Sequence, residues 1–93
     1  MRPRLDATQK AVVAALREIG CSVTSLAAVG GGCPDLLVGV AGRTVLLEVK
    51  SAKATRRKAS ETTPAQDAWA ASWRGGQVAV AHDVEEALDA IER

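Results

Sequence analysis

The stretch Val45-Leu46-Leu47-Glu48-Val49-Lys50 decides the fold, because it joins an uninterrupted apolar run to two charged residues. Consecutive apolar residues, in place of alternating ones, are typical of a strand covered on both faces. Residues 36–40 have the same character and are separated from this stretch by Ala41-Gly42. We therefore predict two central strands, at 36–40 and 44–49, in a small mixed β-sheet flanked by helices, an α/β layer structure.

Helical periodicity and turn residues place the other elements around these two strands. Three capping patterns mark the expected helix starts: Asp6 with Gln9, Thr63-Pro64 with Gln66, and Asp83 with Glu86. The predicted order is α-β-β-β-α-β-α, with elements at 6–19, 21–26, 36–40, 44–49, 64–73, 77–81 and 84–91.

Composition sets the class of protein. The 93 residues are 47% hydrophobic and 25% charged, which predicts one soluble globular domain spanning 1–93. No apolar run approaches the roughly 20 residues that a membrane span requires, and no signal peptide is expected. Cys21 and Cys33 are too few for a disulfide scaffold and read as small buried hydrophobes, so we expect a cytoplasmic protein.

The positive charge is concentrated in one segment. Five cations and no acids lie between Lys50 and Lys58, although the net charge of the chain is only +1. Such a patch favours a polyanion, and contacts with phosphates position DNA without reading its sequence. The expected DNA-binding residues are Lys53, Arg56, Arg57 and Lys58. A solvated loop that keeps the protein soluble accounts for the same charges.

Asp35 and Glu48 are the candidate metal ligands. If Ala41-Gly42 is a two-residue hairpin turn, Val40 pairs with Arg43 and Asp35 then lies opposite Glu48. Cross-strand neighbours lie close enough to share one ion, and carboxylate oxygens suit Mg²⁺, with Mn²⁺ as a substitute. Lys50 projects from the same face as Glu48, and the Val49 carbonyl is a further expected ligand. The alternative is a structural ion pair between Lys50 and one of the acids.

The residues that carry this site resemble a known pattern. Gly32-Cys33-Pro34-Asp35, followed by Glu48-Val49-Lys50 and Gln66, resembles the PD-(D/E)xK nuclease pattern, and the chain is most similar to the VRR-NUC family with its short stand-alone and phage members. The similarity runs from the first helix through the strand at 77–81. It implies a restriction-endonuclease-like fold and Mg²⁺-dependent cleavage of DNA in a bacterial or phage-infected cell.

The resemblance also implies residue roles. Asp35 and Glu48 would hold the metal, and Lys50 would orient the attacking water and offset charge in the transition state. Gln66 would position Lys50 or the substrate phosphate, although a capping box with Thr63 explains it too. Many members carry a Glu on the first helix where this chain has Gln9. Gln9 remains a candidate metal ligand, and its place in the first capping box is an equally good explanation.

The expected function is a metal-dependent DNA endonuclease. Similar short members are associated with dimers and junction cleavage, so a homodimer that cuts branched DNA such as a Holliday junction is expected. The alternatives are a nicking or single-strand nuclease with the same site, and a non-catalytic DNA-binding module. Two further expectations concern packing: Trp69 and Trp73 belong to the core or a subunit interface, with base stacking as the alternative, and Gly30–Gly32 form a flexible turn.

Overall fold

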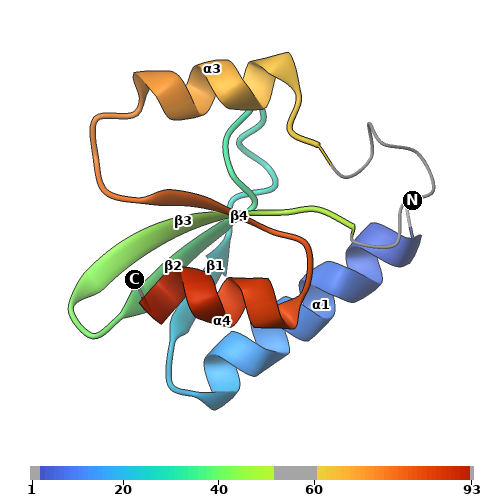
Figure 1. Cartoon of the computed structure of the whole chain (residues 1–93), viewed down its shortest axis with the longest axis vertical. Coiled ribbons are helices and arrows are strands. Elements are labelled where there is room, and N and C mark those ends of the chain that lie inside the picture. The colour runs from blue at the N-terminus through green and yellow to red at the C-terminus, as the bar shows by residue number, and fades with distance from the viewer. Residues whose placement is uncertain (1–2, 52–60, 93) are drawn as a thin grey trace.

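The computed structural model describes residues 3–51 and 61–92 (Figure 1). Its elements are α1 (Pro3–Glu18), β1 (Ser22–Ser25), β2 (Leu36–Val40), β3 (Arg43–Val49), α3 (Pro64–Ser72), β4 (Val78–Ala81) and α4 (Val84–Glu92). The predicted order α-β-β-β-α-β-α is confirmed. None of the described helices is long and apolar enough to cross a membrane.

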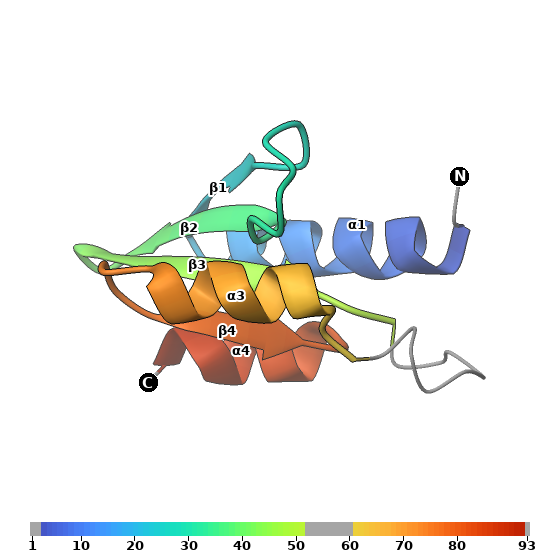
Figure 2. The same cartoon turned by 90° about the horizontal axis from the view of Figure 1, so that it is seen from above.

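The four strands form one mixed sheet in the order β1-β2-β3-β4 (Figure 2). The pairs β1–β2 and β2–β3 are antiparallel, whereas β4 runs parallel to β3. Val40 pairs with Arg43 as predicted, and the turn residues Ala41 and Gly42 have φ angles of 49° and 78°. Positive φ at both positions is the geometry of a type I′ turn, whose twist matches that of the two strands. This turn fixes the register of β2 against β3.

The core lies on one face of the sheet, beneath α1 and α4 (Figure 1). Both helices contribute apolar residues that contact the inward side chains of the strands. The largest fully buried side chains are Leu16, Leu36, Leu47, Val12, Val38, Val45 and Val49. Burial of this apolar surface is the main stabilising contribution to the fold.

Of the described elements only α3 covers the opposite face, and its cover is incomplete (Figure 1). None of the α3 residues is buried. Along β2 burial alternates, so that Leu37 remains 36% exposed on this face, and Val80 of β4 is 40% exposed. Helices therefore lie on both sides of the sheet as predicted, but the expectation that Trp69 and Trp73 belong to the core is wrong.

Two predicted caps differ from those observed. α1 spans Pro3–Glu18, so Asp6 lies within the helix and not at the position before its first turn. Proline is compatible with this start because the first helical N–H groups have no partner within the helix. At α4, Asp83 Oδ1 accepts from the Glu86 N–H at 2.8 Å, as a cap should. The Glu86 carboxylate, however, accepts from the N–H of His82.

Candidate metal-dependent active site

The hairpin register brings Asp35 beside the end of β3. Asp35 directly precedes β2, and its Oδ2 accepts a hydrogen bond from the Val49 N–H at 2.8 Å. The carboxylate thus replaces the ladder partner that β2 would supply if it were longer. Because the N–H and C=O of one strand residue point to the same side of the strand, the Val49 carbonyl also faces Asp35. The Asp35 carboxylate and the Val49 carbonyl are therefore two oxygen donors that lie side by side at the end of β3.

Glu48 is the buried acid of the site. It is only 5% exposed. Its Oε2 accepts from Gln66 Nε2 at 2.8 Å and lies 3.8 Å from Lys50 Nζ. Its Oε1 is buried without a hydrogen-bond partner in the described part of the chain. Such an orphaned oxygen is costly unless a cation or a proton satisfies it.

The electrostatics of the pair favour binding of a positive species. Burial and the neighbouring Asp35 carboxylate raise the pKa of Glu48 to about 8, against the smaller opposing effects of Lys50 and Gln66. At neutral pH the pair therefore retains a proton in the absence of a cation. A divalent cation placed between the two carboxylates could take the place of that proton.

The available oxygen donors fit Mg²⁺. This ion binds through one or two carboxylates and keeps several water molecules. Asp35, Glu48 and the Val49 carbonyl would supply three hard oxygen ligands. No group of three or more His, Cys, Asp and Glu side chains gathers among the residues that the structure describes. The site therefore suits one hard, partly hydrated cation better than a fully protein-ligated metal such as structural zinc.

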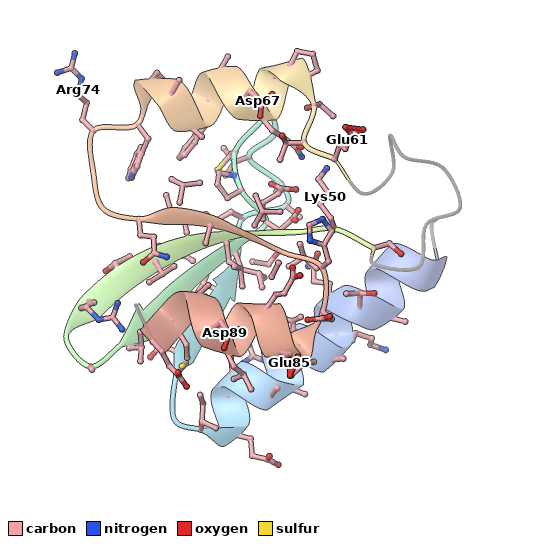
Figure 3. The ribbon with its side chains drawn as sticks, viewed as in Figure 1. Lys50, Glu61, Asp67, Arg74, Glu85 and Asp89 are labelled. Atoms are coloured by element: carbon pink, nitrogen blue, oxygen red, sulfur yellow. The ribbon has the colours of Figure 1, made fainter. Side chains whose placement is uncertain are left out.

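Lys50 and Gln66 approach Glu48 from different elements. Lys50 follows β3 and projects to the α3 side of the sheet, as Figure 3 shows. Gln66 forms the capping box that its sequence pattern allowed, and its side-chain amide also contacts Glu48. Its Oε1 accepts from the Thr63 N–H at 2.8 Å and completes the capping box of α3, while its Nε2 donates to Glu48. The cap fixes the side chain that holds the buried acid.

Gly32 contributes to the site in a way that sequence reasoning missed. Its φ is +89°, and a Cβ atom at this position would lie 2.3 Å from the Ala65 carbonyl oxygen. The glycine loop therefore contacts the backbone of the first turn of α3, next to Gln66. Only glycine permits this approach, whereas the sequence analysis assigned Gly30–Gly32 to a flexible turn. The three consecutive glycines indicate a close backbone contact, but the sequence around them does not identify Ala65 as the residue that they contact.

The remaining predicted residues lie apart from this cluster or outside the description. Gln9 is half-buried in α1, and within the described residues no hydrogen bond links it to Asp35 or Glu48. Lys53, Arg56, Arg57 and Lys58 lie outside the described residues. Cys21 is buried as predicted. Cys33 is half-buried, and the pKa of its thiol is raised by burial and by the charges of Glu48 and Asp35.

Comparison with known proteins identifies the fold. No family model matches the chain, and no curated protein matches it. A solved structure described as a "VRR_NUC domain" matches 97% of this chain and 96% of its own length, with a TM-score of 0.68 and 24% sequence identity. The chain therefore has the fold of a VRR_NUC domain, and the predicted restriction-endonuclease-like architecture is confirmed.

Proposed function

We propose that this protein is a VRR-NUC nuclease, a Mg²⁺-dependent endodeoxyribonuclease that hydrolyses phosphodiester bonds. The observation that carries the proposal is Glu48, which is buried beside Asp35 at the end of β3 and whose Oε1 has no hydrogen-bond partner among residues 3–51 and 61–92. Two adjacent carboxylates, one of them buried, need either a shared proton or a cation between them, and a divalent cation is the species that a nuclease requires there. The VRR_NUC fold supports the same assignment, because it is the fold of a nuclease domain.

In this proposal Asp35, Glu48 and the Val49 carbonyl hold the ion. A bound Mg²⁺ lowers the pKa of its water and stabilises negative charge on the reacting oxygens. Lys50 orients the attacking water and offsets charge on the phosphate in the transition state, because its ammonium lies 3.8 Å from Glu48 Oε2. Gln66 positions Glu48 through its amide. Mn²⁺ is expected to substitute for Mg²⁺.

DNA is the proposed partner, and the cationic segment is its proposed contact. Lys53, Arg56, Arg57 and Lys58 directly follow the site in sequence, so phosphates bound there would flank the cleaved bond. One site hydrolyses one strand at a time. A two-fold homodimer would present two sites, which suits a branched substrate with two strands to cut, such as a four-way junction.

Cleavage of matched substrates tests the proposal. A labelled four-way junction and a linear duplex of the same sequence are incubated with Mg²⁺ or with EDTA. We expect products from the junction only, only with Mg²⁺, and at least about 100-fold slower with Glu48→Gln or Lys50→Met. Glu85→Gln is the matched control, because Glu85 is an acid on α4, across the sheet from α3 (Figure 3). It should cleave like the wild type.

Each other outcome refutes a defined part of the proposal. Undiminished cleavage by Glu48→Gln would remove Glu48 from the mechanism, and equal cutting of both substrates would refute junction selectivity. Cleavage of only one labelled strand would identify a nicking enzyme. A salt-sensitive shift of the DNA with no product would identify a non-catalytic binding module. Light scattering at the concentration of the assay tests the dimer separately.

A further inference from the structure

A groove of about 300 Å³ lies between α3 and the uncovered face of the sheet. Its walls are almost entirely apolar, and they include Leu37 of β2, Leu46 of β3 and both tryptophans of the chain. It exists because none of the α3 residues is buried against the sheet. Apolar clefts with a few polar groups are the usual form of a binding site for a small organic group.

The two tryptophans form one aromatic wall of this groove. The rings of Trp69 and Trp73 stack with their centroids 4.9 Å apart and an interplanar angle of 16°. Trp73 is 45% exposed. A Cβ atom on Gly75 would lie 2.7 Å from the Trp73 indole, so the ring packs closely over the glycine backbone. The aromatic wall is therefore held in place and is also open to solvent.

The groove lies next to the candidate active site. Cys33 lines it, and the same residue lies within the electrostatic reach of Asp35 and Glu48. Gln66, which holds Glu48, lies one helical turn before Trp69 on α3. A group seated in the groove would therefore be close to a phosphate bound at the metal site.

Cations lie near both ends of α3. Figure 3 shows Lys50 beneath the N-terminal end of the helix and Arg74 beyond its C-terminal end. Glu61 and Asp67 also lie near the first end, where Asp67 accepts from the Thr62 hydroxyl at 2.6 Å. The groove itself is lined by neither cation, and its apolar, aromatic wall matches the flat face of a nucleobase.

We propose that this groove binds one unpaired nucleobase of the DNA substrate, which stacks on the Trp69–Trp73 wall. The inference rests on the proposed function and deepens it. In a paired duplex the base faces are covered by their neighbours, so only an unpaired base can enter. Every base has a π-face, so stacking selects DNA structure without reading sequence. The groove thereby links recognition of unpaired DNA to cleavage beside it.

Intrinsic tryptophan fluorescence reports on the groove directly, because Trp69 and Trp73 are the two tryptophans of the chain, which has no Tyr or Phe. The wild type is titrated in EDTA, where no cleavage is expected, with three DNA duplexes that differ at one position. One carries a single bulged base, one an abasic nucleotide at the bulge, and one no bulge. We expect the bulged base to quench the fluorescence. The abasic and fully paired duplexes should quench the fluorescence less and bind at least about fivefold more weakly. This factor corresponds to the smallest free energies measured for stacking of a base on an aromatic side chain.

Variants of the wall separate stacking from general hydrophobicity. Trp73→Leu should lose the preference for the bulged base over the abasic duplex, whereas Trp73→Phe should retain it, with Trp69 as the reporter in both. Gly75→Ala should weaken it, since its Cβ would displace the Trp73 ring. Ile19→Ala is the control, because Ile19 is 58% exposed and follows α1, away from the groove. Circular dichroism verifies that each variant is folded.

Equal quenching by all three duplexes would overturn the inference. It would also be overturned by fluorescence that changes with protein concentration alone, because a second copy of the chain would then occupy the groove. The outcome is independent of catalysis. A protein that selects the bulged base but cleaves nothing with Mg²⁺ would refute the proposed function alone, and a junction nuclease without this preference would refute the groove alone.

Discussion

The two faces of the sheet differ in how completely they are covered. α1 and α4 bury one face in a continuous apolar core, whereas α3 has no buried residue and leaves a groove above the other. The second helix layer is attached by two described contacts that matter for the site: Gln66 with Glu48, and Ala65 against Gly32. Stability is therefore concentrated on the first face, and the candidate site and groove on the second.

This division has a physical reason. A buried apolar face tolerates no ions or water, while a metal site needs oxygen ligands and access for a charged substrate. Glu48 of β3 and Lys50, which follows the strand, project toward α3, and the core residues Leu47 and Val49 alternate with them toward α1 and α4. Because successive side chains of a strand point to opposite faces, β3 contributes residues to the core on one face and to the candidate site on the other.

The largest predicted difference in stability is between alanine substitutions of two neighbouring leucines of β2, whose side chains lie on opposite faces of the sheet. Leu36 is 1% exposed and Leu37 is 36% exposed. Leu36→Ala should reduce the free energy of unfolding by about 2–5 kcal/mol, because it removes buried methyl groups and leaves a cavity. Leu37→Ala should reduce it by less than about 1 kcal/mol. Urea unfolding measures both. Equal losses would show that the α3 face is as tightly packed as the core.

The next effect concerns pH and the buried acid. The folded pKa of Glu48, about 8, lies above its ordinary value of 4.5, so between these values the folded state binds the extra proton. Its contribution to stability is thus fully present below pH 4.5 and is lost as the pH rises through 8, by at most about 1.4 kcal/mol per pH unit. Unfolding in EDTA from pH 5 to 9 should show a loss that is smaller in Glu48→Gln.

Metal binding should reverse this loss. Because Mg²⁺ competes with the proton, it should raise the unfolding temperature of the wild type more at pH 8 than at pH 6. Glu48→Gln should show little of this increase. A rise that does not depend on pH, or one that the variant shares, would place the ion elsewhere on the protein.

A smaller effect on stability, with a larger one on activity, is expected at Gly32. Gly32→Ala introduces a Cβ where φ is positive and where the Ala65 carbonyl already lies. We expect a loss of about 1–2 kcal/mol in stability. Cleavage should fall by about tenfold or more, because α3 must move and Gln66 with it. Gly30→Ala is the matched control, since its φ is also positive but no atom lies within 4 Å of its Cβ. Equal losses of activity would mean that backbone strain alone matters.

The hairpin and the paired acids could be predicted from sequence because their determinants are local. Ala41-Gly42 sets the turn, the turn sets the register, and the register brings Asp35 to the end of β3. The start of α1 could not be predicted, since Asp6 and Gln9 fit a helix interior as well as a capping box. The position of α3 could not be predicted either. It depends on the contact of Gly32 with Ala65, which joins residues far apart in the sequence.

The smallest predicted effect compares the caps of the two helices that follow the hairpin. Thr63 Oγ1 accepts from the Gln66 N–H at the start of α3, and Asp83 Oδ1 accepts from the Glu86 N–H at the start of α4. Substitution of either capping residue by alanine removes its hydrogen bond and should destabilise the helix that it caps by about 1 kcal/mol. For Asp83→Ala the full amount should appear in global unfolding, because α4 packs in the core. For Thr63→Ala most of it should appear as faster amide exchange within α3, since a helix without buried residues can open while the core stays folded. Global losses of the same size in both variants would show that the two faces unfold as one unit.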